Sequence, residues 1–154
     1  MRKLLPIAAV LAVAVLANQF ATATGTRIAQ EETIVLTDVI TASRIVDAGN
    51  PGTFSVGDLV AIRARLDAGA GTKVGNDRTN CVSNKGSTFV CTAEYTIEGR
   101  GDITAQWVQD FSSIARVTGA ITGGTGEYEN VRGSIEIAFA SGSPEQDLTL
   151  HLLP

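Results

Sequence analysis

An acid on the apolar face of a predicted strand is the first group that could do chemistry. Asp38 alternates with Leu36 and Ile40 along the segment 32–47. A carboxylate in such a place is costly unless it is paired, so Asp38 is a candidate cavity acid with a raised pKa. The alternative is an Asp38 that lies near a strand end and is hydrogen-bonded to backbone groups.

Asp77 and Tyr95 form the second candidate group. A predicted hairpin of 73–83 with 88–97 places them on one face, opposite each other. They could form a hydrogen-bonded pair on a cavity wall, with the tyrosine hydroxyl donating to a ligand oxygen. The alternative is a solvated strand end beside an ordinary core tyrosine. Together with Asp38, these two residues are the predicted catalytic groups.

Other residues on the same faces are predicted to line a cavity around these groups. Trp107 shares a face with Ile103 and Ala105, where an indole either fills an ordinary core or forms a cavity wall. The predicted cavity-lining residues are Leu36, Thr79, Phe89, Ala93 and Trp107.

Two common kinds of site are excluded. His151 is the single histidine and lies isolated near the C-terminus, where a structural role is expected, so no Ser-His-Asp triad is indicated and a metal centre lacks ligands. The glycine cluster 123–126 does not open a helix, so it is not a nucleotide-binding loop. We therefore predict no metal site.

The first residues predict a cleavable signal helix and export. Arg2 and Lys3 precede an apolar run from Leu4 to Ala17, which at about 14 residues is short of the roughly 20 that span a membrane. Residues 21–23, Ala-Thr-Ala, fit a signal peptidase site. We expect cleavage near residue 23 and a secreted product, with a retained membrane anchor as the alternative.

The exported part is acidic and of single-domain size. Removal of residues 1–23 leaves ten basic and sixteen acidic residues, a net charge of −6. Such a chain is a poor candidate for binding nucleic acid or an anionic membrane. We predict a loose segment at 24–31 and one domain at 32–154.

Cys81 and Cys91 are the only cysteines. An even count in an exported chain favours a disulfide. A metal pair would need further ligands, and the spacing is far from the Cys-x-x-Cys of a redox pair. We therefore predict a structural disulfide.

Period-two alternation and turn residues dominate the rest of the chain, and little of it is predicted to be helical. The pattern predicts about eight strands, at 32–47, 59–67, 73–83, 88–97, 102–109, 112–121, 131–140 and 147–153. Short strands separated by Gly-rich turns are typical of an antiparallel barrel or a sandwich. Eight strands close into a barrel with room for side chains or one small ligand.

Four motifs in a fixed order resemble the allene oxide cyclases and the dirigent proteins. The segment 54–60 contains Gly-Asp-Leu, 73–81 opens on a basic residue and a glycine, and 89–106 forms a strand, a short turn and a strand. The most specific match is 121–128, Ile-Thr-Gly-Gly-Thr-Gly-Glu-Tyr, followed by Val-Arg-Gly at 131–133. Its predicted structural turn residues are Gly123, Gly124, Thr125, Gly126 and Tyr128.

The resemblance implies an all-β, eight-stranded antiparallel barrel with an apolar cavity and no metal or organic cofactor. Family members close an epoxide into a cyclopentenone, steer phenol radical coupling, or catalyse cyclisation in polyketide pathways. Plant relatives form trimers, so a homo-oligomer is a further expectation. The chain has Thr37-Asp38-Val39 where the plant cyclases have a Glu and an Asn, so we do not expect allene oxide cyclase activity.

Three functions follow as hypotheses. The first is a secreted barrel that binds or conformationally steers a small hydrophobic compound. The second is a cofactor-independent cyclase or isomerase of secondary metabolism, including polyketide cyclisation. The third is a structural or surface-interaction barrel without a cavity.

Overall fold

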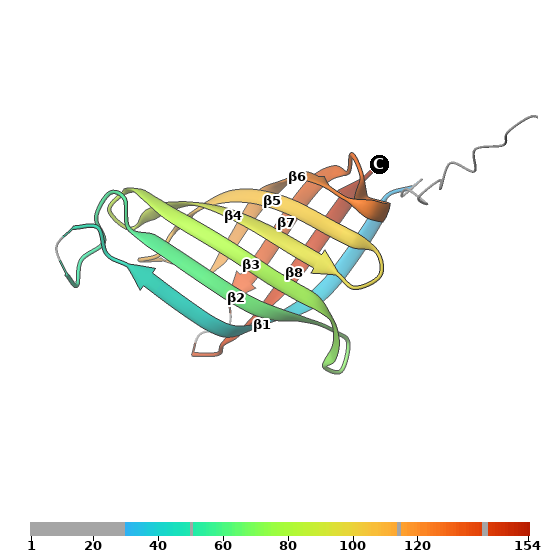
Figure 1. Ribbon diagram of the computed structural model, residues 1–154, viewed down its shortest axis with the longest axis horizontal. Coiled ribbons are helices and arrows are strands. Elements are labelled where there is room, and N and C mark those ends of the chain that lie inside the picture. The colour runs from blue at the N-terminus through green and yellow to red at the C-terminus, as the bar shows by residue number, and fades with distance from the viewer. Residues whose placement is uncertain (1–29, 50, 114, 140–141) are drawn as a thin grey trace, which may run out of the picture.

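The computed structural model describes residues 30–49, 51–113, 115–139 and 142–154 (Figure 1). The predicted signal helix and most of the predicted loose segment lie outside these ranges. The strands are β1 (Glu32–Val46), β2 (Leu59–Ala68), β3 (Thr72–Lys85), β4 (Thr88–Ile97), β5 (Gly101–Asp110), β6 (Arg116–Gly124), β7 (Arg132–Phe139) and β8 (Glu145–Leu153), with a 3-10 turn η1 (Gly126–Tyr128) after β6. Within the described ranges, no helix has the length and apolarity needed to cross a membrane.

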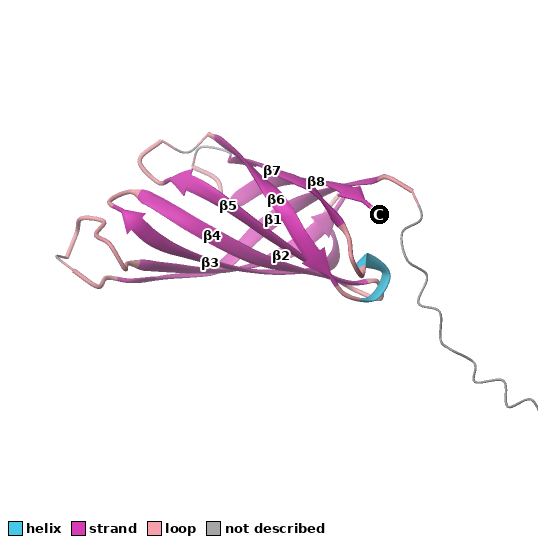
Figure 2. Ribbon diagram, turned by 90° about the horizontal axis from the view of Figure 1, so that it is seen from above, coloured by secondary structure: helices cyan, strands magenta, loops and turns pink. Residues whose placement is uncertain are grey.

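The eight strands form one closed antiparallel barrel, in which each strand pairs with its neighbours in the chain. The pairing of β1 with β8 closes the cylinder, from Glu32 opposite Leu152 to Val39 opposite Glu145. Figures 1 and 2 show the strands inclined around a common axis, with the β1–β2 loop extending beyond one end. The predicted eight-stranded antiparallel barrel is confirmed.

The strand β6 is the one whose bounds differ most from the prediction of 112–121. It begins only at Arg116, because the Asp110 carboxylate accepts hydrogen bonds from the backbone N–H and the hydroxyl of Ser112 and so forms a tight turn. It continues to Gly124, because Gly123 and Gly124 stay paired with β5.

One end of the barrel is filled with apolar side chains. Alternation along each strand points every second residue inward, and at this end those residues are aliphatic. Buried there are Leu66, Ile97, Ile103, Ile121, Val131, Leu150 and Leu152. Tyr128 of η1 is fully buried beside them, and Figure 2 shows η1 at this end of the barrel. This packed end supplies the hydrophobic core of the domain.

Arg100, in the turn between β4 and β5, fastens the packed end. It donates two hydrogen bonds of 2.8 Å to the Glu32 carboxylate and one of 2.7 Å to Glu127. Its guanidinium also lies 4.9 Å from the centre of the Tyr128 ring. These contacts tie the start of β1 to η1 and raise the pKa of Arg100.

A glycine makes room for the only tryptophan. Gly119 of β6 lies directly opposite Trp107 of β5. A Cβ atom at position 119 would lie 2.8 Å from the Trp107 Cβ and 3.0 Å from a methyl group of Ile135. It would also lie 2.6 Å from the backbone oxygen of Gln106, so a side chain at position 119 would force the two paired strands to shift beside Trp107.

The predicted disulfide between Cys81 and Cys91 is confirmed. The two residues are directly opposite each other in the β3–β4 hairpin, with their Cα atoms 4.0 Å apart. Both side chains face inward and are buried.

This bond should stabilise the barrel measurably. The two cysteines are 10 positions apart, and closing a loop of that size contributes about 2.5–3 kcal/mol in the chain-entropy treatment. We expect the Cys81→Ala/Cys91→Ala variant to lose about that much free energy of unfolding in guanidinium titrations. Reduced wild-type protein is the control, because it keeps both side chains and loses only the cross-link. Equal stability of the oxidised and reduced proteins would contradict the prediction.

Candidate functional site

The half of the barrel away from η1 contains a cavity of about 210 Å³. Cys81 of the disulfide lines it together with six aliphatic and aromatic side chains: Ile40, Ile62, Trp107, Phe111, Ile137 and Phe139. Five polar residues interrupt this wall: Asp38, Thr79, Tyr95, Gln109 and Gln146. An apolar hollow with a few convergent polar groups is the usual form of a small-molecule site.

Asp38 projects into this cavity from the middle of β1 and is only 4% exposed. Its Oδ2 atom accepts a hydrogen bond of 3.0 Å from Nε2 of Gln146, whereas its buried Oδ1 atom has no partner. Burial raises the pKa of Asp38 to about 7, against the smaller opposing effect of the Gln146 hydrogen bond. Of the two alternatives for Asp38, the structure has the buried cavity acid.

Asp77 lies behind the cavity wall, where it contacts the lining residue Thr79. It is 2% exposed and does not itself line the hollow, which begins at its neighbour Thr79. The Thr79 hydroxyl lies 3.0 and 3.1 Å from the two Asp77 carboxylate oxygens and donates to this carboxylate. Burial, and then the charge of Asp38, raise the pKa of Asp77 to about 8.

Tyr95 completes the polar group. It lies opposite Asp77 in the β3–β4 register and is 1% exposed. Burial raises the pKa of Tyr95 well above 10, and the charges of Asp77 and Asp38 raise it further. The phenol therefore stays protonated, and a hydrogen bond with Thr79 holds it at the cavity wall.

These three residues form a proton-holding group without a positive partner. No Lys, Arg or His side chain is among the residues that line the cavity. A carboxyl group that titrates near pH 7 can both accept and donate a proton under neutral conditions, which suits general acid–base catalysis. Across the described residues, no group of three His, Cys, Asp or Glu side chains is placed to hold a metal ion.

Trp107 is held in place on the cavity wall by a hydrogen bond to Gln109. Its indole Nε1 donates a hydrogen bond of 2.7 Å to Oε1 of Gln109, which is itself buried. The indole thus has its one polar group satisfied, and it presents a fixed aromatic surface to the hollow.

Three phenylalanines gather where the β1–β2 loop meets the barrel. The ring centres of Phe89 and Phe111 are 4.6 Å apart, and Phe54 of the loop lies 5.0 Å from Phe89. The loop is fixed by Asp58, whose carboxylate accepts hydrogen bonds of 2.7 and 2.8 Å from the backbone N–H groups of Ser55 and residue 48. These bonds lower the pKa of Asp58, so the Gly-Asp-Leu motif has a structural role here.

The structure places the predicted cavity-lining residues in two groups. Thr79 and Trp107 are on the cavity wall. Leu36, Phe89 and Ala93 are buried outside it, which differs from the prediction. Leu36 packs opposite Leu148, Phe89 belongs to the aromatic cluster, and Ala93 lies between Thr79 of β3 and Ala105 of β5. The alternation of side chains along a strand identifies which residues point inward. It does not identify the position along the barrel axis at which the interior becomes hollow.

The predicted structural turn lies at the packed end, remote from the cavity. Gly123 and Gly124 are still in β6, and Thr125 precedes the 3-10 turn Gly126–Tyr128. The Thr125 hydroxyl donates to the Asp102 carboxylate at 2.9 Å and fixes the turn against β5. The motif that carries the family resemblance is therefore part of the scaffold.

Gln109 and Gln146 are site residues that the sequence analysis missed. Each continues an inward-facing series by two positions, Gln109 after Trp107 and Gln146 before Leu148. Extending the period-two pattern to the strand ends would have found both. Gln109 is the last residue of the predicted strand 102–109, and Gln146 lies just outside the predicted strand 147–153.

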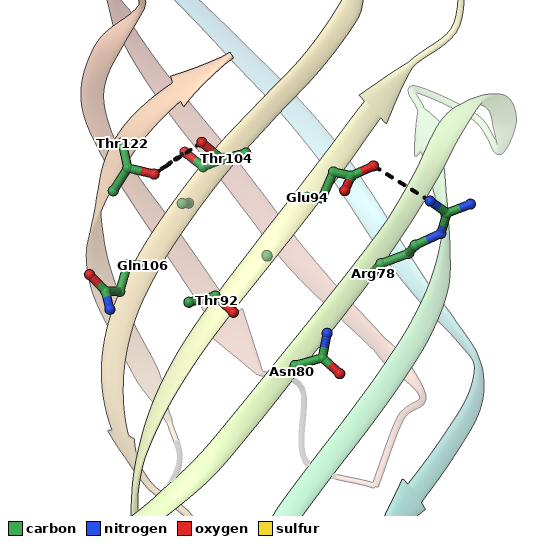
Figure 3. Close-up of a pocket in the computed structure, with 9 residues that line it drawn as sticks. Arg78, Asn80, Thr92, Glu94, Thr104, Gln106 and Thr122 are labelled. Atoms are coloured by element: carbon green, nitrogen blue, oxygen red, sulfur yellow. Dashed lines mark hydrogen bonds and ion pairs between the residues drawn. The ribbon is translucent and has the colours of Figure 1, made fainter. Parts of the chain in front are cut away.

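A larger hollow of about 550 Å³ lies on the outer surface of β3–β6 (Figure 3). Four of its polar side chains form two pairs, Arg78 with Glu94 at 3.5 Å and Thr104 with Thr122 at 3.0 Å. The Arg78 and Glu94 side chains are 68% and 46% exposed. Exposed, mutually paired groups of this kind contribute little to binding, so the interior cavity is the candidate site.

Comparison with solved structures identifies the same architecture in proteins that act on small molecules. A pyocyanin demethylase superimposes with a TM-score of 0.69 and 28% identity, over 79% of this chain and 100% of the other. An exo-specific intermolecular Diels–Alderase, AbnU, gives 0.63 and 14% identity over 79% and 97% of the two chains. A pterocarpan synthase dirigent protein gives 0.63 and 16% identity over 80% and 94%.

The chain has the barrel fold of the dirigent proteins and cyclases. The resemblance drawn from the ordered motifs is thus confirmed at the level of the fold. No protein-family model matches the sequence, and no curated protein matches it. The barrel is shared, and the cavity side chains must be interpreted from this chain itself.

The buried acids predict that the protein loses stability as the pH rises. An unfolded aspartic acid titrates near pH 3.9, whereas folded Asp38 and Asp77 titrate at about 7 and about 8. Between about pH 4 and 8 the folded state binds more protons, so the free energy of unfolding should fall, by an amount on the order of several kcal/mol. Guanidinium titrations at pH 5, 6.5 and 8 measure this slope.

The Asp38→Asn/Asp77→Asn variant should show a flatter slope and exceed the parent protein in stability at pH 8. Asp147→Asn, at an exposed position of β8, is the matched control and should keep the parent slope. A parent protein that is equally stable at pH 5 and pH 8 would show that the two carboxyl groups are not buried as described.

Proposed function

We propose that this protein binds a small, largely apolar compound inside the barrel and holds it in one reactive conformation. The observation that carries the proposal is the division of the interior, which is packed at one end and hollow at the other. The hollow part combines aromatic walls with three polar residues, Asp38, Thr79 and Tyr95. A filled barrel, the third of the sequence-based hypotheses, has no such space.

A rigid barrel of this kind would act mainly through orientation. A flexible compound that enters the cavity loses conformers, and its reacting atoms are held close together. Trp107, Phe111 and Phe139 would confine the apolar part of the compound. Tyr95 would donate to an acceptor atom of the compound, and Asp38 would fix a donor.

Catalysis by a cofactor-independent cyclase or isomerase is the second candidate. It is favoured by one observation, the carboxyl group of Asp38 with a pKa of about 7 at the cavity wall. Such a group can remove a proton from a bound compound and return it at another atom. The structural likeness to a pyocyanin demethylase supports action on a small molecule.

Export and assembly belong to the same proposal. The N-terminal signal pattern supports a secreted protein that meets its ligand outside the cytoplasm. A disulfide that faces the cavity suits an oxidising compartment. Assembly into a trimer is proposed from the family resemblance.

Native mass spectrometry of the protein purified from the culture medium should test the binding function and the export together. We expect one species with the mass of a polypeptide that begins near residue 24. A second species should be heavier by the mass of one bound small molecule. The expected size of this molecule follows from the 210 Å³ cavity, which is somewhat larger than one that holds benzene. A protein without any adduct, recovered only from the cell interior, would contradict both parts.

Filling the cavity should abolish binding without unfolding the barrel. Ile137→Phe adds an aromatic ring to the cavity wall, so the adduct should disappear and the affinity for added quinoline should fall at least tenfold. Val108→Phe is the matched control, because Val108 is 58% exposed on the outer face of β5. If Ile137→Phe retains full binding while its melting temperature is normal, the ligand is bound elsewhere.

A further inference from the structure

The cavity contains a carboxylate oxygen with no partner. Asp38 is more than nine-tenths buried, and its Oδ1 atom makes no hydrogen bond, although Oδ2 is bound by Gln146. An unpaired buried acceptor costs free energy that the folded protein alone does not recover. Because Asp38 lines the hollow, the missing partner can be supplied by a ligand.

The groups around Asp38 leave its negative charge uncompensated. Gln146 of β8 and Ile62 of β2 are neutral, and Asp77 of β3 and Tyr95 of β4, whose pKa values the Asp38 charge raises, are themselves acidic groups. The remaining strands that line the cavity contribute only neutral residues, namely Trp107 and Gln109 from β5 and Ile137 and Phe139 from β7.

The basic residues of the nearby strands face away from this space. Arg63, Arg65 and Arg78 are exposed on the outer surface of β2 and β3. Arg65 is already bound there by Asp67 at 2.7 Å. None of the three side chains lines the cavity.

On this geometry, and resting on the proposed binding function, we propose that the ligand is an organic cation. Its positively charged nitrogen lies against Oδ1 of Asp38, and its hydrocarbon part lies among Trp107, Phe111 and Phe139. Aromatic walls favour such a ligand further, because the face of an indole or phenyl ring attracts a cation.

The size of the hollow limits the ligand to one or two rings. A cavity of 150 Å³ accommodates benzene, and this one measures about 210 Å³. A compound with one aromatic or two fused rings and a protonated or quaternary nitrogen has the appropriate dimensions. Above about pH 8, where Asp77 ionises, its charge adds to the attraction, since the carboxylate lies directly behind the wall that carries Thr79.

A neutral ligand that accepts a hydrogen bond from a protonated Asp38 is the competing possibility, and it has the opposite pH dependence. The carboxyl group titrates at about pH 7, so a cation binds better as the pH rises and an acceptor binds better as it falls. A permanently charged probe separates the two, because only the protein then titrates.

The test uses the mature protein with its disulfide intact and two probes of nearly equal shape, N-methylquinolinium and neutral 2-methylquinoline. Isothermal titration calorimetry at pH 8.5 should show the cation binding at least tenfold more tightly. Between pH 6 and pH 8.5 the affinity for the cation should rise about tenfold, since about a tenth of a group with a pKa near 7 is ionised at pH 6.

Asp38→Asn should bring the affinity for the cation down to the affinity that the parent protein shows for 2-methylquinoline at the same pH. The pH series on the parent protein provides a second measurement that does not depend on the variant. The cation proposal would be overturned if 2-methylquinoline bound more tightly than the cation. It would also be overturned if neither Asp38→Asn nor pH changed the affinity for the cation. Either result would leave the binding function intact. Failure of both probes to bind, together with no adduct in the native mass spectrum, would overturn both.

Discussion

The pairing of β1 with β8 is the interaction on which the rest of this structure depends. It turns a meander of eight strands into a cylinder, so that every strand has two neighbours and one protected face. The same pairing places Asp38 opposite Gln146, the residue that holds one of its carboxylate oxygens. Closure of the sheet therefore also brings Asp38 and Gln146 together, because Asp38 has this hydrogen-bond partner only in the closed barrel.

Closure also limits what the interior can contain. Eight strands leave space for about one layer of side chains or one small ligand. This chain divides that space along the barrel axis. One end is stabilised by buried aliphatic residues, by Tyr128 and by the contacts of Arg100. The other end can stay hollow because the packed end supplies the hydrophobic core that stabilises the fold. Acids that would destabilise a packed core are tolerated beside the hollow.

Much of this arrangement was predictable from the sequence, and the remainder depended on information that alternation does not contain. Period-two patterning predicted the strands, the inward face of Asp38 and the opposition of Cys81 to Cys91, because each is a local property of a strand or a hairpin. The depth of the cavity is set by the shear of the closed sheet, which relates residues far apart in the chain. Leu36 and Asp38 are two positions apart on one face, yet only Asp38 lines the hollow. The same limit explains why Gln146, 108 positions from Asp38, was missed.

The neighbour-to-neighbour order of the strands has a consequence for the order of folding. Each hairpin joins segments that are adjacent in the chain, so these pairings have small loop-closure costs and can form early. The β1–β8 pairing joins the two most distant strands and requires all of the others to be in place. We therefore expect the cavity to be the last part of the molecule to form. A compound that binds only the closed barrel acts on the reverse step, because it holds the seam between the first and last strands shut and slows unfolding from that seam.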